Sequence, residues 1–234
     1  MNFDTKISAT EQGEHQIYGH TLTGLAETAT FTDAIFLLYT GKLPTPGQRP
    51  LLDAMLVMAI EHGVEAPSLY VPRISVASGN PVHVGIAAGI LAIGDVHGGA
   101  GEAAAQLLAR DEDAATLVQE YLSKGKRMPG FGHRTYKDED PRASLIFKKA
   151  KEAGIPLAAF EKAYAIEAAL VEAKGKKLPL NIDGAFAAAT LAFGLTSPAA
   201  RALFVLARVA GMGAHAIEEL QQKKGYYRLG DLQG

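Results

Sequence analysis

Apolar residues in this chain recur mostly at the three- and four-residue spacing of amphipathic helices, and the alternation typical of strands does not persist. The segment 30–41 predicts a helix with Thr32 as its N-cap and Gly41 at its C-terminal cap. Apolar residues in the segment 48–63 fall almost all round the expected helix. This pattern predicts a deeply buried helix that ends at Gly63.

Other segments show the same helical pattern, whereas a short apolar run at 68–76 resembles a strand but is interrupted by Pro72. The alanine and glycine content of several helices would let neighbouring helices approach closely. Because helical patterns dominate, we predict an all-α protein. No internal repeat or linker is visible, so any subdivision must be into two closely packed parts. The further predicted helices are 82–94, 101–110, 112–123, 141–153, 157–173, 184–193 and 198–222.

Composition narrows the class of protein. The 234 residues suffice for one large domain or two smaller ones with a substantial core, and 48% of them are hydrophobic. A net charge of -2 gives no electrostatic case for nucleic acid or an anionic membrane. The lack of cysteine excludes disulfides and thiolate chemistry. The polar start and the shortness of apolar stretches such as 84–94 lead us to expect a cytoplasmic protein.

The segment RMPGFGHRTYKDEDPR at 127–142 concentrates cationic side chains around a glycine-flanked histidine, His133. Glycines let the main chain approach a ligand closely, and Arg142 could hold a carboxylate through two parallel hydrogen bonds. The preceding KGKR at 124–127 adds three positive charges. Taken alone, KGKR would be read as a solvated basic loop; joined to PGFGHR it indicates a site for phosphates or carboxylates.

Two more glycine-flanked groups lie elsewhere in the chain. His97, before a predicted helix, could be held neutral near a helix N-terminus and donate to an enolate oxygen, although a lone histidine is more often a packed core residue. Asp183 could be catalytic or could simply cap the next helix. His62 ends an apolar helix, and Arg208, inside an apolar run, needs an anionic partner or a path to solvent.

Metal and nucleotide chemistry find no support in the residue spacing. None of the seven histidines forms an HxxxH or HExxH pair, and phosphate-loop, dinucleotide and GxSxG patterns are missing. We therefore expect no metal site. General acid–base chemistry on a polyanionic substrate remains.

These motifs together resemble the citrate synthase superfamily. GFGHRTYKDEDPRA, VHGGAGEA and NIDG are similar to the segments around the family's second catalytic histidine, first catalytic histidine and catalytic aspartate, in the same order. The segments 18–44 and 206–219 resemble its N-terminal and C-terminal helical regions. Only a short stretch, about 46–54, stands where citrate synthases have a long helical segment. This compact form resembles citryl-CoA lyase and the C-terminal module of ATP-citrate lyase.

The resemblance implies a large helical domain from 1–102 and 188–234 with a small CoA-binding helical domain, 103–187, inserted between them. It also implies a homodimer or a dimer of dimers, in which Arg228 reaches a neighbour's site. No ATP-dependent ligase domain is expected in this chain, which leaves a separate citryl-CoA synthetase as a conceivable partner.

The implied reaction is cleavage of citryl-CoA to acetyl-CoA and oxaloacetate, with the CoA thioester as substrate rather than as a permanently bound cofactor. One alternative is a citrate-synthase-like condensing enzyme that joins acetyl-CoA to oxaloacetate or another 2-oxoacid and releases CoA. The other is a non-catalytic CoA-binding assembly subunit. The implied catalytic residues are His97, His133 and Asp183. The implied substrate-binding residues are His62, Arg142, Arg208 and Arg228. The implied CoA-binding residues are Lys124, Lys126, Arg127, Met128, Gly130, Gly132 and Arg134.

Overall fold

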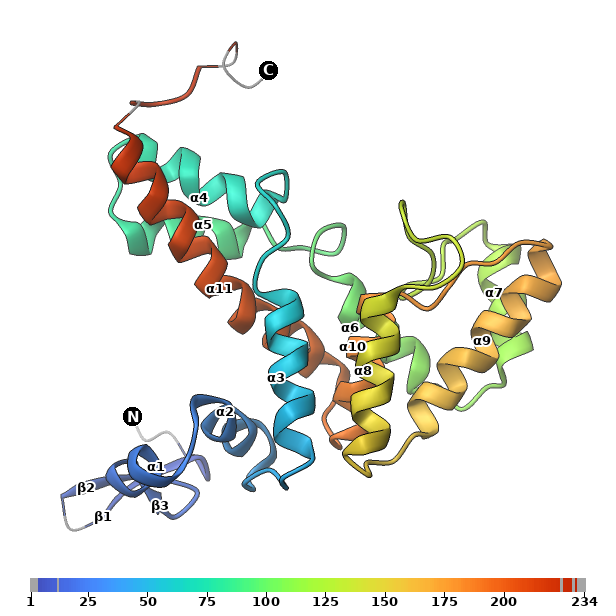
Figure 1. Cartoon of the computed structure of the whole chain (residues 1–234), viewed down its shortest axis with the longest axis horizontal. Coiled ribbons are helices and arrows are strands. Elements are labelled where there is room, and N and C mark those ends of the chain that lie inside the picture. The colour runs from blue at the N-terminus through green and yellow to red at the C-terminus, as the bar shows by residue number, and fades with distance from the viewer. Residues whose placement is uncertain (1–3, 12, 224, 229, 231–234) are drawn as a thin grey trace.

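The structure, a computed structural model, describes residues 4–11, 13–223, 225–228 and 230, and this part of the chain is mainly helical, as predicted (Figure 1). It contains eleven helices and one three-stranded antiparallel sheet of order β1-β2-β3. The strands are β1 Ser8–Glu11, β2 Glu14–Ile17 and β3 His20–Thr21. The helices are α1 Leu22–Thr28, α2 Phe31–Thr40, α3 Gln48–Ala59, α4 Pro67–Ala77, α5 Val82–Leu91, α6 Ala100–Leu108, α7 Ala114–Ser123, α8 Pro141–Glu152, α9 Ala158–Lys174, α10 Ile182–Ala192 and α11 Ser197–Gln222.

The N-cap predicted for α2 was wrong by two residues. Thr30, rather than Thr32, caps the helix, and it forms a reciprocal capping box with Asp33. Thr32 is buried and bonds Asp53 of α3 instead. Gly41 ends the helix in the left-handed conformation, at φ 74°, as the sequence indicated.

Helix α3 is shorter and less buried than predicted. It ends at Ala59, before Gly63. Leu51, Leu52 and Met55 are buried, whereas Val57 is 66% exposed, so only one face of the helix joins the core. The residues after its end, 60–63, form a turn and become part of the site described below.

Two features of the fold were not predicted. The run 68–76 lies in a helix, α4, which begins with Pro67 in the first turn, where its missing N–H costs nothing. The sheet is made of short polar strands with mostly exposed side chains, so it lacks the apolar alternation that reveals a strand.

Helix α11 runs along the molecule and joins its parts (Figure 1). One end packs with α4 and α5, and the other packs with α3, α6 and α10. The main core lies among α3, α6, α8, α9 and α10, and α7 packs on α9 at the far side. The domain boundaries at 102/103 and 187/188 stay a prediction.

By length and composition α11 could cross a membrane, so the sequence reading of the apolar stretches overlooked it. Core helices of soluble proteins pass the same test, and α11 packs against five other helices. It also carries the buried Arg208 and Glu219. We therefore treat α11 as a core helix.

Candidate active site

A cavity of about 230 Å³ lies where the end of α3, the loop before α6, the start of α10 and the middle of α11 meet. Its lining brings together six residues that the sequence singled out from widely separated segments. They are His62, His97, His133, Arg142, Asp183 and Arg208.

His97 is held in one protonation state by its neighbours. Its loop closes on itself, because the Gly94 N–H donates to the His97 carbonyl at 2.8 Å and the His97 N–H donates back at 3.2 Å. The His97 Nε2 accepts the backbone N–H of Ser68 at 3.2 Å and lies 2.9 Å from the Ser68 hydroxyl. A nitrogen that accepts a backbone N–H carries no proton, so Nδ1 carries the hydrogen of the neutral ring.

The pKa of His97 is lowered chiefly by burial, and further by the cation Arg208 and by His62. The sequence attributed a neutral ring to a nearby helix N-terminus. Burial and the neighbouring charges are the causes in the structure. The ring is therefore a neutral hydrogen-bond donor at neutral pH.

The loop that carries His133 is bonded to the segment before α10. The Gly132 N–H donates to the Pro179 carbonyl at 2.7 Å, and the Asn181 N–H donates to the Gly130 carbonyl at 3.0 Å. The Asn181 amide also donates to the Gly132 carbonyl at 2.9 Å. This backbone pairing brings His133 and Asp183 to the same cavity, although about 50 residues separate them in sequence.

The His133 ring is also fixed by backbone donors. Its Nδ1 accepts the N–H groups of Thr135 and Tyr136 at 3.1 and 3.2 Å, and the ring stacks on Tyr136. Burial and the cation Arg142 lower its pKa. The neutral ring in this conformation therefore carries its proton on Nε2.

Asp183 does not cap α10. The N-cap is Asn181, whose side chain accepts the N–H groups of Asp183 and Gly184 at 3.0 and 3.2 Å. Within the described residues nothing hydrogen-bonds the Asp183 carboxyl, which lines the cavity. Burial raises its pKa, and this effect outweighs the lowering by Arg142 and His62.

Arg142 is aimed by a buried carboxylate that sequence reasoning missed. Asp140, the N-cap of α8, accepts from the Arg142 Nε and Nη2 at 3.0 and 2.8 Å and from the Ile182 N–H at 3.1 Å. It therefore joins the starts of α8 and α10 beneath the cavity. An aspartate directly before a proline that opens a helix was the sequence signal for it.

Arg208 is only 4% exposed, and no carboxylate of the described residues forms an ion pair with it. Its Nε donates to the Ala59 carbonyl at 2.7 Å and its Nη1 to the Ser68 hydroxyl at 3.2 Å. Burial lowers its pKa, whereas Glu61 and Asp183 favour its charged form. A buried guanidinium without an ion pair can compensate its desolvation by binding an anion in the cavity.

A second cavity, of about 460 Å³, adjoins the first at His133. It gathers Lys126, Arg127 and Arg134 over an apolar floor that includes Met128. Of the other predicted residues, Gly132 also lines it; Lys124 pairs with Glu120 at 2.7 Å, and Gly130 packs beneath α10. Lys137, which the sequence indicated as a cationic donor of the 127–142 segment, lies on its rim; the sequence missed Lys174 and Lys176, which complete the rim.

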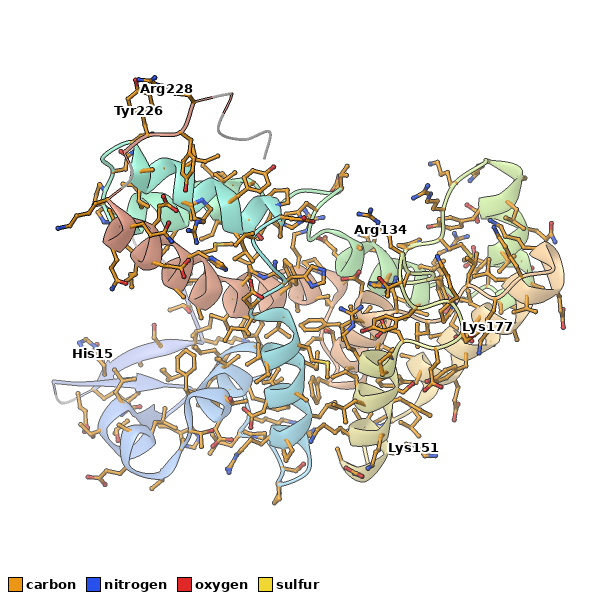
Figure 2. The ribbon with its side chains drawn as sticks, turned by 45° about the horizontal axis from the view of Figure 1, so that its top comes forward. His15, Arg134, Lys151, Lys177, Tyr226 and Arg228 are labelled. Atoms are coloured by element: carbon orange, nitrogen blue, oxygen red, sulfur yellow. The ribbon has the colours of Figure 1, made fainter. Side chains whose placement is uncertain are left out.

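Arg228 lies apart from both cavities of its own chain. Figure 2 shows Arg228 and Tyr226 beyond the C-terminal end of α11, far from Arg134 beside the His133 loop. The Arg228 guanidinium lies 5.8 Å from the centre of the Tyr226 ring. The structure therefore does not join Arg228 to the other predicted substrate-binding residues within one chain.

A helical fold that gathers two neutral imidazoles, a buried carboxyl and a buried guanidinium around one cavity is typical of acid–base enzymes acting on anionic substrates. The family model for the citrate synthase C-terminal domain matches residues 44–229. The chain belongs to the citrate synthase family and is an enzyme of that superfamily.

Individual relatives agree in fold. The structure of citryl-CoA lyase from Hydrogenobacter thermophilus matches with a TM-score of 0.92 at 36% identity, covering 99% of this chain and 92% of that one. ATP citrate lyase from Methanothrix soehngenii, solved with citrate and coenzyme A, matches in fold with a TM-score of 0.87 at 22% identity, over 98% of this chain and 40% of that one.

A curated relative, 2-methylcitrate synthase from Shewanella oneidensis, is 32% identical over 193 residues, which are 78% of this chain and 50% of the relative. The chain thus spans about half the length of the curated relatives it matches.

Proposed function

We propose that the protein is a citryl-CoA lyase that cleaves citryl-CoA to acetyl-CoA and oxaloacetate. The observation that carries the proposal is the arrangement around the first cavity, where two neutral imidazoles meet a carboxyl whose pKa is raised. The likeness to a citryl-CoA lyase over nearly the full length of both chains supports this reaction over condensation.

The acetyl half of the substrate would lie between His97 and Asp183. The Nδ1–H of His97 points away from Ser68 and would donate to the thioester oxygen, which stabilises the enolate formed when the C–C bond breaks. Asp183, whose pKa is raised by burial, would then deliver a proton to the enolate carbon and make the methyl group.

The oxaloacetate half would lie against His62, Arg142 and Arg208, which line the cavity and can donate hydrogen bonds to the substrate's carboxylates. The tertiary hydroxyl loses its proton as its carbon becomes a ketone, and His133 is the proposed acceptor. To accept at Nε2, the ring must carry its own proton on Nδ1, which now faces two backbone N–H donors. Cleavage therefore requires the 133–136 turn to rearrange in the reacting complex.

The second cavity would hold CoA. Its six cations suit the phosphates, and its apolar floor suits the adenine ring. Because His133 borders both cavities, a CoA thioester bound in the second would extend its acyl group into the first. Lys174 and Lys176 join the proposed CoA-binding residues.

The proposed assembly is a homodimer, or a dimer of dimers, in which Arg228 enters the partner's site. Exposed apolar side chains on α5 support an interface there, with Leu91 86% and Ile90 37% exposed. A separate synthetase would supply citryl-CoA, the small domain would close over it, and the enzyme would work in the cytoplasm.

The test is product analysis with the purified protein. Incubation with citryl-CoA should yield acetyl-CoA and oxaloacetate in equal amounts. Under the alternative of a condensing enzyme, acetyl-CoA with oxaloacetate or propionyl-CoA with oxaloacetate would release free CoA thiol; the curated 2-methylcitrate synthase relative motivates the second pair. Binding of CoA without turnover of any acyl substrate would favour the non-catalytic assembly subunit.

A further inference from the structure

A line of hydrogen-bonded charged and polar side chains lies behind the turn that carries His62. Arg73 of α4 contacts His215 of α11 at 3.2 Å through Nη1 and Nδ1. The His215 Nε2 lies 3.1 Å from an oxygen of Glu61, the residue before His62. The line therefore begins between α4 and α11 and ends at the cavity wall.

The partners of His215 fix its tautomer. A guanidinium has only donors, so the His215 Nδ1 must accept from Arg73. The remaining proton of the neutral ring is then on Nε2, which donates to the Glu61 carboxylate. The His215 ring thus accepts a hydrogen bond from the Arg73 cation on one side and donates one to the Glu61 anion on the other.

The Glu61 carboxylate fixes the backbone of the 60–63 segment and influences the charge of a nearby arginine. The same Glu61 oxygen accepts the Gly63 N–H at 2.7 Å, and Gly63 adopts φ +82°, a conformation that favours glycine. Glu61 also favours the charged form of the buried Arg208. The Glu61 carboxylate therefore fixes the backbone next to His62 and adds a negative charge to the surroundings of Arg208.

The far end of the line is anchored. Glu219 is 3% exposed and pairs with the Arg73 Nε at 2.7 Å, and the Tyr227 hydroxyl donates to its other oxygen at 2.6 Å. Arg73 also bonds Glu218. Held by two carboxylates, Arg73 is a fixed reference point for the His215 ring.

We propose that His215 and Glu61 are positioning residues that set His62 for binding the dicarboxylate part of the substrate. The inference rests on the proposed function, in which His62 binds that part. The proposed CoA cavity shares no residue with the line. Loss of the line should therefore weaken dicarboxylate binding and leave CoA thioester binding unchanged.

The test compares two isosteric replacements. A glutamine amide nitrogen can reach the place of Nε2, whereas an asparagine amide reaches only that of Nδ1. His215→Asn and Glu61→Ala should each raise the Kd of oxaloacetate and its KM in the condensing direction about tenfold or more. His215→Gln should stay within about threefold of wild type. The KM of acetyl-CoA should not change in any variant.

His20→Asn is the matched control, because it makes the same replacement at an exposed histidine of β3, outside the line and outside both cavities. It should behave as wild type. Equal damage by the glutamine and asparagine replacements of His215, or an equal rise of both KM values, would overturn the proposal.

A reading without substrate keeps the inference separate from the proposed function. The His62 ring signals in NMR spectra of the free protein should shift in His215→Asn and stay in place in His215→Gln. Unshifted signals in His215→Asn would overturn the positioning role. The variants could show this His62 response while the wild-type protein neither binds oxaloacetate nor cleaves citryl-CoA. That outcome would contradict only the proposed function.

Discussion

At the scale of single residues, the site depends on protons held in unusual places. Backbone N–H groups occupy one nitrogen of His97 and one of His133, so each neutral ring presents an N–H from its other nitrogen. Burial favours the neutral form of Asp183 as well. Near neutral pH the two imidazoles are therefore uncharged, and the surrounding arginines supply the positive charge of the site.

Replacing Asp183 by asparagine should lower kcat by about a hundredfold or more, because the amide cannot deliver the proton to the enolate. Steady-state cleavage of citryl-CoA measures this. Asp111→Asn, an exposed aspartate away from both cavities, is the control. Turnover close to wild type in Asp183→Asn would rule out the proposed role of Asp183.

The same substitution should reveal the burial of this carboxyl in a stability measurement. The pKa of Asp183 is raised above its ordinary 3.8, so the folded protein holds that proton more tightly than the unfolded chain. This contribution to stability is full below 3.8 and is lost as pH rises through the raised pKa. The amide of the Asp183→Asn variant does not titrate and has no such loss. The Tm of Asp183→Asn minus that of wild type should therefore increase with pH, and a constant difference would contradict it.

Activity should persist at pH values below the ordinary pKa of histidine. The pKa values of His97 and His133 are both lowered from 6.5, so both rings stay neutral as pH falls through that value. The acidic limb of kcat/KM for citryl-CoA, measured between about pH 5 and 8, should lie below 6.5. A limb above 6.5 would show that one ring is charged in the free enzyme.

The sequence was sufficient for the residues that face the cavity and insufficient for those that hold them. His97, His133 and Asp183 are flagged by glycines and by family motifs. Ser68 and Asn181 have ordinary sequence surroundings, and their importance comes from atoms brought close by folding. Lys174 and Lys176 were missed because they are far from the His133 loop in sequence. Folding places the end of α9 on the opposite side of the second cavity from that loop.

At the scale of elements, the start of α10 touches the His133 loop through two glycines. A Cβ on Gly184 would lie 2.5 Å from the Gly130 carbonyl oxygen, and Gly130 itself has φ +87°. This contact lets the backbone pairing of the two segments form. Gly130, predicted to bind CoA, therefore contributes through packing in this structure.

Gly184→Ala should force the loop and α10 apart. We expect a loss of about 1–3 kcal/mol in the free energy of unfolding, from overpacking, and a lower kcat. Gly213→Ala in α11 is the control, since its Cβ would meet only Ile86 at an ordinary 3.6 Å and should stabilise the helix slightly. Thermal and urea unfolding measure both, and a neutral Gly184→Ala would contradict the close contact.

Helices with a periodic apolar pattern were predictable, short ones such as α6 and α7 included, whereas α4 and the small sheet were not. The periodic apolar pattern located α8, α9 and α11 to within about two residues, because each buries one stripe. The small sheet has too few buried side chains to leave a pattern. In the sequence, Pro72 made the α4 segment resemble an interrupted strand. In the structure the proline is accommodated inside the helix, where it is buried.

At the scale of the whole molecule, the separation of Arg228 from its own cavity has a consequence for assembly (Figure 2). If the proposed dimer exchanges Arg228, each site combines residues of two chains. Asp183 of one chain and Arg228 of its partner would then serve one site, and defects in these two residues could be separated.

Mixing inactive Asp183→Asn with inactive Arg228→Ala protein should restore activity. After exchange of subunits at equal amounts, half of the dimers are mixed and one site in each is intact, so about a quarter of wild-type activity should return. Native mass spectrometry, which separates mixed from unmixed dimers by mass, confirms the exchange. No recovery despite exchange would place Arg228 in its own chain's function.

Helix α11 imposes one more condition. Phe204 and Arg208 of this helix line the first cavity, and His215 and Glu219 of the same helix belong to the line of side chains behind His62. Each residue turns a helix by about 100°, so inserting or deleting one residue between them would swing half of these side chains to another face. Homologous chains should therefore vary in length elsewhere, and the spacing from Phe204 to Glu219 should be inherited unchanged.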